Sequence, residues 1–298
     1  MDSNTNKKCM VCGSTDISTF LDCTDHFITK ETFRIDTCRS CGFRFTANAP
    51  AAEQIGAYYK SEAYISHSDT HKGLINKLYH IVRNIMLGKK LKLIRQLTDG
   101  RRLLDIGCGT GHFLNYMQKN GFTCEGIEID QAAREFGIRE FGLKVDSPDM
   151  IYKKDTASTY DVITLWHVME HLYDAGAYLS WMHQVLKPDG VLIIALPNCA
   201  SLDARYYGQY WAAYDVPRHL WHFKPAVFKQ FVSQYGFKSV KVKGMPFDAY
   251  YNSMMSATYA GKKGAMLQGL YTGLRSTVHS HGKPELSSSV IYLLKKTL

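Results

Sequence analysis

Four of the eight cysteines form two pairs whose spacing suits a metal ion. Cys9 and Cys12 make the first C-x2-C pair, Cys38 and Cys41 make the second, and a glycine follows each pair. A C-x2-C turn directs two thiolates to one centre, and the glycine lets the backbone amides face the sulfurs. Four thiolates leave no open coordination position, so the spacing predicts a structural zinc site. Disulfide bonds are the alternative, but they fit poorly with the cytoplasmic location expected below and with the scattered positions of the other four cysteines.

A second candidate site is a loop that follows an apolar run and has glycine at three alternate positions: Gly107, Gly109 and Gly111. Glycines at this spacing let a backbone approach a ligand closely. The dinucleotide fingerprint G-x-G-x-x-G would need a glycine where His112 stands. Asp105 beside the loop favours a cation over a pyrophosphate, and Glu128 could accept hydrogen bonds from both hydroxyls of a ribose. We therefore expect a ligand that carries a ribose and a positive charge.

Regular elements must hold these residues in place, and from residue 100 onward short apolar strands alternate with helices. Strands are expected over 101–107, 123–130, 160–169, 191–198, 238–244 and 288–296, and helices over 111–121, 131–142, 176–190 and 224–237. Pro188 and Gly190 are expected to end the third of these helices. The alternation predicts an α/β fold with a doubly wound parallel sheet, in which ligands bind at the carboxyl ends of the strands.

The chain divides into three expected parts. Residues 1–48 form the zinc-binding module, with strands over 18–23 and 31–36, and residues 49–99 form a polar linker and helices. The helical spacing in this second part is carried by Leu74, Leu78, Ile81, Val82, Ile85 and Met86. Residues 100–298 form the main domain.

Residues 100–198 resemble class I S-adenosylmethionine-dependent methyltransferases. Four segments carry the resemblance, in the family's order: LLDIGCGTGHFL (103–114), GIEID (126–130), YDVITLWHVMEHL (160–172) and LKPDGVLIIALPN (186–198). The resemblance implies a Rossmann-like, mostly parallel sheet of seven strands and S-adenosylmethionine as the cofactor. It also implies a cofactor-binding set of Asp105, Gly107, Gly109, Gly111, Glu128, Ile129 and Trp166. A dinucleotide-binding oxidoreductase is the alternative interpretation of the loop.

Within this family, the segments are most similar to ubiquinone-type O-methyltransferases and to methyltransferases of natural-product and cell-surface sugar pathways. A four-cysteine module ahead of the fold also resembles certain sugar C-methyltransferases, but the similarity covers only the cysteines.

Transfer of a methyl group to a hydroxyl or an amine also needs a base, and histidine suits that role near neutral pH. His167 and His171 lie in the segment 160–172, beside the expected cofactor pocket, and His219 follows the 191–198 strand. We expect His219 to be the general base. For His171 a catalytic role and a structural role both stay open.

The segment 205–223, RYYGQYWAAYDVPRHLWHF, is crowded with aromatic and polar side chains. An aromatic wall with a few polar groups suits a ring-shaped acceptor such as a sugar or a phenol. We expect Tyr214, Arg218 and His222 to contact the acceptor, with Arg218 holding a phosphate or a carboxylate. A loop packed onto the fold by its aromatic rings is the alternative. The whole substrate-side segment is expected over 199–224.

Residues 245–287 form a long insertion before the last expected strand and supply a second substrate-side segment. The apolar residues of this insertion, together with Lys262, Lys263 and Arg275, could form an amphipathic lid or a peripheral membrane contact. A helical cap over the substrate and a contact between copies of the chain are the alternatives, and we favour these.

The composition is that of an ordinary globular protein, with 45% hydrophobic residues and a formal net charge of +9. The longest apolar run has six residues, 191–196, so no transmembrane segment is expected, and the polar start favours a cytoplasmic location. The positive charge fits an acidic partner or a well-solvated surface.

The leading functional hypothesis is methyl transfer to a small molecule: a sugar, a glycan intermediate or a related metabolite, including acidic or lipid-linked ones. A tRNA or rRNA methyltransferase is the second hypothesis, although the amino-terminal segment has no concentrated basic stripe, and LPN (196–198) stands where base N-methyltransferases carry Asn/Asp-Pro-Pro-aromatic. A non-catalytic module that binds the cofactor is the third.

Overall fold

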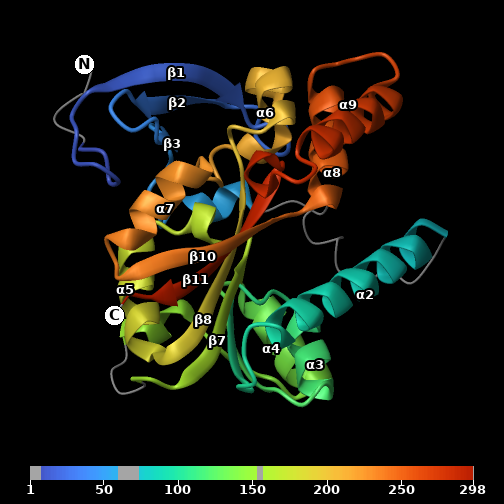
Figure 1. Ribbon diagram of the computed structural model, residues 1–298. Coiled ribbons are helices and arrows are strands. Elements are labelled where there is room, and N and C mark those ends of the chain that lie inside the picture. Colours follow the sequence, from blue (N-terminus) through green and yellow to red (C-terminus); the bar gives the residue numbers. More distant parts are fainter. Residues whose placement is uncertain (1–7, 60–73, 153–156, 298) are drawn as a thin grey trace. The chain divides into compact units, whose positions relative to one another are not determined.

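The computed structural model describes residues 8–59, 74–152 and 157–297 (Figure 1). Part of the linker expected over 49–99 lies outside the described residues, as do the side chains of Leu74, Leu78, Ile81 and Val82. Two compact units interleave along the chain. Unit 1 comprises Met1–Lys60, Met169–Tyr173 and Ala195–Tyr292, and unit 2 comprises Ser61–Val168, Asp174–Ile194 and Leu293–Leu298.

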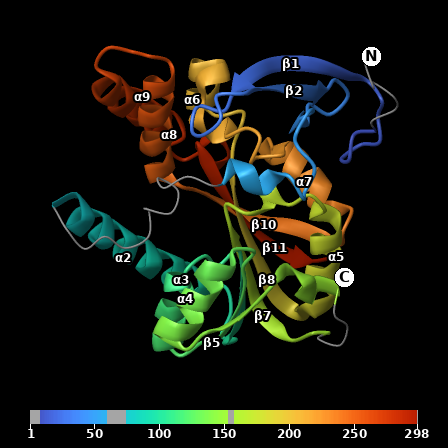
Figure 2. The ribbon, with the colours of Figure 1, turned by 180° about the vertical axis from the view of Figure 1, so that it is seen from behind.

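Unit 2 is built on four neighbouring strands: β4 (Arg102–Ile106), β5 (Thr123–Ile127), β6 (Lys144–Asp146) and β7 (Tyr160–Trp166). β4 pairs in parallel with both β5 and β7, and β5 pairs in parallel with β6. α3 (His112–Lys119) and α4 (Gln131–Phe141) lie on one side of these strands, and α5 (Ala175–Val185) lies on the other (Figures 1 and 2). Because both faces are covered, β4 and β7 are buried almost throughout.

The complete sheet has seven strands in the order β10-β11-β8-β7-β4-β5-β6. The other three strands are β8 (Leu186–Pro197), β10 (Phe237–Gly244) and β11 (Ser289–Lys296). The predicted doubly wound, mostly parallel sheet is confirmed. The strand β6 was not predicted, because three residues are too short to show a periodic pattern.

One predicted helix boundary was wrong. The sequence placed the end of the 176–190 helix at Pro188 and Gly190, but α5 ends at Val185 and β8 already begins at Leu186. A residue before proline avoids the α conformation, so Lys187 cannot continue the helix. The chain therefore enters the strand before it reaches the proline.

The helix α2 (Leu74–Arg95) confirms the expected helical segment, and of the six predicted apolar positions the structure describes the side chains of Ile85 and Met86. Ile85 is half exposed, whereas the buried side chains lie further along the helix, at Leu87, Leu91, Leu93 and Ile94. No described helix of the chain is long and apolar enough to cross a membrane.

Unit 1 contains a second, four-stranded sheet in the order β1-β2-β3-β9. The strands predicted over 18–23 and 31–36 are confirmed in β1 (Ile17–Thr24) and β2 (Thr32–Cys38), which form an antiparallel hairpin, and β3 (Arg44–Thr46) extends it. β9 (Trp221–His222) pairs antiparallel with β3, so a segment nearly 180 residues later in the chain completes the sheet of the cysteine module.

The remaining helices of unit 1 are α6 (Leu202–Tyr207), α7 (Pro225–Ser233), α8 (Pro246–Tyr259) and α9 (Ala265–His279). Short 3-10 helices span Ile55–Tyr58, Pro148–Tyr152, Met169–His171, Gly208–Tyr210, Ala212–Tyr214 and Pro284–Leu286, of which only Pro148–Tyr152 belongs to unit 2. α8 and α9 pack closely because small residues face the contact: a Cβ on Gly269 or Gly273 would lie within 3 Å of the α8 backbone.

Candidate functional site

The glycine loop of unit 2 turns from β4 into α3 through left-handed backbone conformations. Gly107, Gly109 and Gly111 have φ of +71°, +54° and +82°. A Cβ on Gly107 would lie 2.3 Å from Val168, and one on Gly111 would lie 2.3 Å from Leu143, so these two glycines allow close packing. A Cβ on Gly109 would meet no heavy atom within 4 Å. The backbone of Gly109 thus faces open space, as a ligand-binding loop requires.

Glu128, one residue beyond β5, is held by the backbone of that same loop. The N–H of Gly109 donates to its Oε2 at 2.8 Å, and the N–H of Asp130 donates to its Oε1 at 2.9 Å. A carboxylate has about four acceptor positions, so both oxygens keep acceptor capacity for two hydroxyl groups. The open backbone and the oriented carboxylate fit a ribose-bearing cofactor.

Asp105 is buried at the end of β4, where the hydroxyl of Thr164 donates to it at 2.5 Å. The pKa of Asp105 is raised to about 7, mainly by burial and also by the charge of Glu128. The Thr164 hydrogen bond and the charge of Lys90 act in the opposite direction. A group with this pKa gains by ionising when a positive charge comes close. Asp105 therefore fits a cationic ligand such as a sulfonium.

Trp166 ends β7, and its indole stacks edge-on against Phe113 with ring centroids 5.9 Å apart. The Lys90 ammonium lies 3.9 Å from the Trp166 ring. The indole Nε1 is buried and has no hydrogen-bond partner among the described residues, which leaves a donor for a ligand. Ile129 is 78% exposed, so its side chain is accessible to a flat apolar group.

His167 follows β7 directly and has a φ of +58°, the left-handed region that non-glycine residues rarely adopt. Such strain persists only where the surrounding structure enforces it, and it concentrates at functional positions. The structure thus places this predicted catalytic residue at the carboxyl end of a central strand.

The four paired cysteines of unit 1 converge as their spacing predicts. Sγ of Cys9 lies 3.6 Å from that of Cys41, Sγ of Cys12 lies 3.5 Å from that of Cys38, and all four lie within 4.8 Å of one another. Tetrahedral zinc with Zn–S bonds of about 2.3 Å separates its sulfurs by about 3.8 Å. The cluster therefore fits zinc.

The two cysteine turns share one backbone geometry. Gly13 N–H donates to Cys9 O at 2.8 Å, Gly42 N–H donates to Cys38 O at 2.7 Å, and both glycines have φ near +74°. Cys23 lies outside the cluster, where its thiol donates to the carbonyl of Gln209.

A second convergent group in unit 1 consists of Glu170, His171 and His219, whose possible ligand or proton-transfer atoms lie within 4.8 Å of one another. His219 Nδ1 lies 2.9 Å from the Ala213 carbonyl and must donate to it, so in the neutral ring Nε2 holds the lone pair. Burial, helped by the neighbouring His219, lowers the pKa of His171 to about 4. The rings of the two histidines meet edge to face at 4.5 Å. This group can accept a proton at His219 Nε2.

The three residues predicted to contact the acceptor are largely engaged with the protein. Arg218 is 2% exposed and donates to both Asp25 and Asp215, at 2.9 and 2.6 Å. Tyr214 is buried and accepts from Arg44 at 3.3 Å. His222 is also buried, with its Nε2 3.1 Å from the Thr46 hydroxyl, and burial lowers its pKa well below the usual value.

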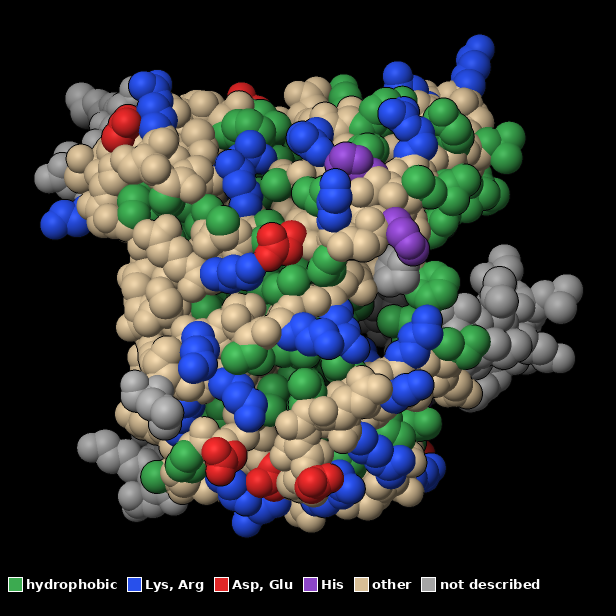
Figure 3. All heavy atoms as spheres, viewed as in Figure 1, with side chains coloured by type: hydrophobic (Ala, Val, Ile, Leu, Met, Phe, Trp, Pro, Cys, Tyr) green, Lys and Arg blue, Asp and Glu red, His purple; other side chains and the backbone are tan. Residues whose placement is uncertain are grey.

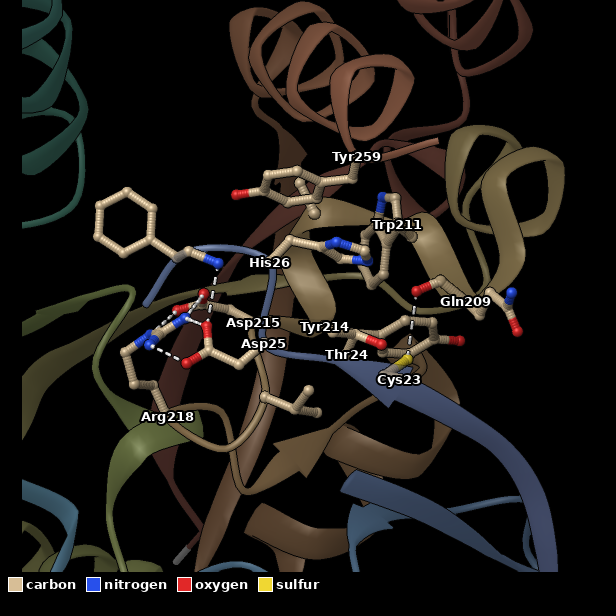
Figure 4. Close-up of a pocket in the computed structure, with 13 residues that line it drawn as sticks. Cys23, Thr24, Asp25, His26, Gln209, Trp211, Tyr214, Asp215, Arg218 and Tyr259 are labelled. Atoms are coloured by element: carbon tan, nitrogen blue, oxygen red, sulfur yellow. Dashed lines mark hydrogen bonds and ion pairs between the residues drawn. The ribbon is translucent and has the colours of Figure 1, made fainter. Parts of the chain in front are cut away.

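Two of these residues nevertheless line a small pocket of unit 1 (Figure 4). Its wall combines part of the predicted segment, namely Gln209, Trp211, Ala212, Tyr214, Asp215, Val216 and Arg218, with Cys23, Thr24, Asp25, His26, Phe27 and Tyr259. The His26 ring stacks on Tyr259 at 4.7 Å. Neither His219 nor His222 lines the pocket, and the contacts of His222 are those of a packing residue.

Sequence reasoning missed Asp25, His26, Tyr259 and Lys90. Single polar or aromatic residues on a hairpin turn or in a helix carry no spacing signal. Only the tertiary structure brings them to a site.

The doubly wound sheet, the glycine loop and the oriented acid after β5 together define a class I S-adenosylmethionine-dependent methyltransferase fold. The chain belongs to the family described as "Methyltransferase domain", whose profile matches residues 79–242, more than half of the chain.

Curated relatives carry the name "Ubiquinone biosynthesis O-methyltransferase". One from Cereibacter sphaeroides is 29% identical over 163 residues, which cover 50% of this chain and 65% of the relative. One from Rhodopseudomonas palustris is 31% identical over 104 residues, 34% of this chain and 41% of the relative. The chain thus matches less than two thirds of the length of these relatives.

Solved structures share the fold at low identity. Geranyl diphosphate C-methyltransferase from Streptomyces coelicolor has a TM-score of 0.56 at 14% identity and covers 84% of this chain and 100% of its own. Phosphoethanolamine N-methyltransferase 2 from Haemonchus contortus has a TM-score of 0.54 at 15% identity, covering 86% of this chain and 62% of its own.

Proposed function

We propose that this protein transfers a methyl group from S-adenosylmethionine to a hydroxyl group of a ring-shaped small molecule. The observation that carries the proposal is the carboxylate of Glu128, held by the backbone of the glycine loop. The cofactor would supply a methyl group made electrophilic by its sulfonium. The names of the relatives support an oxygen acceptor.

Unit 2 would bind the cofactor. Both oxygens of Glu128 would accept from the ribose hydroxyls, while the open backbone at Gly109 would let the cofactor approach. Asp105 would place a negative charge close to the positive one on the ligand. Ile129 and the indole N–H of Trp166 offer an apolar and a polar contact. The solved structure of the S. coelicolor methyltransferase contains S-adenosylhomocysteine, and that of the H. contortus methyltransferase contains S-adenosylmethionine. Both support the choice of cofactor.

Unit 1 would bind the acceptor and take its proton. We assign the base to His219, because the Nδ1 bond to Ala213 O fixes the tautomer with a lone pair on Nε2. Asp215 lies 3.9 Å from that nitrogen and also lines the pocket, so its charge would stabilise the imidazolium that forms. His171 would have a positioning role, since its low pKa makes it a weak base near pH 7.

The rings of Trp211, Tyr214, His26 and Tyr259 give the pocket the aromatic wall that suits a sugar or a phenol. The acceptor class therefore stays as the sequence predicted, a sugar, a glycan intermediate or a related metabolite, and the names of the relatives add quinone precursors to it. A cytoplasmic location is part of this proposal.

The test is a turnover assay with labelled cofactor. Cell extract is incubated with the enzyme and deuteromethyl S-adenosylmethionine, and mass spectrometry then finds the compound that gains the label. His219→Ala should bind the cofactor unchanged but lower the turnover number by about a hundredfold or more. The exposed His281→Ala serves as the matched control. Equal turnover in both variants would exclude His219 as the base. If the label appeared in RNA, the acceptor would be RNA and not a small molecule.

We further propose that Cys9, Cys12, Cys38 and Cys41 hold one structural zinc ion. Their sulfur separations and repeated backbone turns support it. Protein purified without added metal should contain about one zinc per chain. Cys38→Ser should lose the zinc, whereas Cys23→Ser, outside the cluster, should keep it. A folded, metal-free wild-type chain would contradict the proposal.

A further inference from the structure

The outer face of α9 is apolar although it faces solvent. Its exposed side chains are Met266, Leu267, Leu270, Tyr271, Leu274 and Val278, and their exposed fractions run from 41% to 76%. At 100° per residue these six positions fall on one side of the helix. The opposite side is buried and consists of Gly269, Thr272, Gly273 and Ser276. The usual amphipathic pattern is thus reversed, with small residues inside and large apolar residues outside.

Basic residues precede, interrupt and follow the apolar positions of this face along the chain. Residues 261–283 contain Lys262, Lys263, Arg275 and Lys283, together with two histidines, and no aspartate or glutamate. Lys262 and Lys263 are exposed in the turn between α8 and α9, immediately before Met266 and Leu267, the two most exposed apolar residues of the helix. Figure 3 shows hydrophobic and basic side chains gathered together over α8 and α9.

We propose that the α9 face docks on an anionic phospholipid membrane surface. The apolar positions run from Met266 to Val278, which are 12 residue steps apart, about 18 Å along the helix axis. A helix of this kind lies in the plane of the interface, with its apolar side at the acyl boundary and its cations among the headgroups. Each lysine or arginine near an anionic leaflet strengthens binding by about fivefold.

Charge distinguishes this occupant from a second copy of the chain. A two-fold contact pairs a patch with itself, so it would bring together two copies of residues 261–283, which carry four basic residues and no acid. The aliphatic side chains have no role on a phosphate backbone, which disfavours nucleic acid. An anionic lipid surface satisfies both the apolar and the positive parts of the face. This inference does not depend on methyl transfer.

The experiment is flotation of the full-length protein with vesicles of phosphatidylcholine alone or mixed with phosphatidylglycerol. We expect binding to the mixed vesicles and at least about tenfold weaker binding to the neutral ones. Leu267→Gln/Leu274→Gln should lower the partition coefficient about tenfold, since glutamine keeps the helix propensity but removes the apolar contacts. Ile138→Gln, at a half-exposed position of α4, is the matched control and should bind as the wild type does.

A second pair of variants tests the position of the charge. Lys262→Glu/Lys263→Glu and Lys238→Glu/Lys241→Glu change the net charge equally, and all four lysines are exposed. Only the first should lose vesicle binding, by about tenfold or more. Equal losses, or equal binding to neutral and anionic vesicles, would overturn the proposal. A dimer in sedimentation that Leu267→Gln/Leu274→Gln dissociates, without vesicle binding, would assign the face to a second copy.

Discussion

The guanidinium of Arg218 donates to the carboxylate of Asp25 at 2.9 Å, in an ion pair whose side chains are 2% and 0% exposed. The same guanidinium donates to Asp215, so one cation is shared by two acids. The pair joins the hairpin turn of the cysteine module to the segment after β8, inside unit 1 (Figure 4). The predicted ligand-binding arginine is therefore first of all a link that holds the pocket wall together.

Replacing Asp25 should destabilise the protein strongly. Asp25→Asn leaves a buried guanidinium with half of its compensating charge, and we expect a loss of about 3 kcal/mol in the free energy of unfolding. Asp16→Asn is the control, because the Asp16–Arg39 pair is exposed on both sides at 3.9 Å and should change stability by less than about 0.5 kcal/mol. Urea unfolding followed by circular dichroism measures both. Similar losses of unfolding free energy in both variants would show that the buried ion pair stabilises the protein no more than the exposed one.

Asp25 should also make the protein sensitive to acid. The Arg218 hydrogen bond and backbone amides lower its pKa to about 2, although burial alone would raise it. A lowered folded-state pKa means that the unfolded chain takes up the proton first as the pH falls. The stabilisation is therefore complete above about pH 4 and is lost between about pH 4 and pH 2, with a total of about 2 kcal/mol. Urea titrations over this range should show a steeper decline for the wild type than for Asp25→Asn, and parallel curves would contradict the assignment.

Glu128 should determine the affinity for the cofactor. Glu128→Gln keeps the shape but replaces charge-assisted hydrogen bonds by neutral ones, so we expect about tenfold weaker binding of S-adenosylmethionine in calorimetry. Glu140→Gln, an exposed acid of α4 paired with Arg139, should bind as the wild type does. An unchanged dissociation constant in Glu128→Gln would place the ribose elsewhere.

Alanine substitutions at two glycines of the loop should affect the stability of the protein and its affinity for the cofactor differently. Gly111→Ala combines a φ of +82° with a clash against Leu143, so it should cost about 2 kcal/mol in the free energy of unfolding. Gly109→Ala has open space for its methyl group and should cost about 1 kcal/mol. That methyl group would stand where the cofactor approaches, so Gly109→Ala should weaken cofactor binding by more than about tenfold. If Gly109→Ala binds normally, the ligand does not approach this backbone.

Removal of the proposed zinc ion should destabilise unit 1. A strong chelator at high concentration should lower the midpoint of thermal unfolding by several degrees, because a closed four-thiolate site contributes its binding energy to folding. Adding zinc back should restore the midpoint in the wild type. The chelator should have no effect on Cys38→Ser, and a shift of equal size in that variant would point to an effect outside the cluster.

The sequence alone determined the sheet, the glycine loop and the cysteine cluster. Each depends on residues close together in the chain or on a repeating pattern. The apolar runs predicted the strands, the G-x-G-x-G spacing predicted the loop, and the two C-x2-C pairs needed only a hairpin between them to converge. Local spacing fixes local geometry, so these features are readable without tertiary contacts.

The tertiary structure decided how unit 1 is assembled. β9 completes the sheet of the cysteine module, and Asp25 pairs with Arg218 over 193 residues. Neither pairing has a periodic signal, because each depends on where distant segments meet. The same reason explains why Arg218 and His222, whose residue types suit an acceptor site, are occupied by protein partners: a side chain's chemistry is visible in the sequence, but its burial and its partners come from the fold.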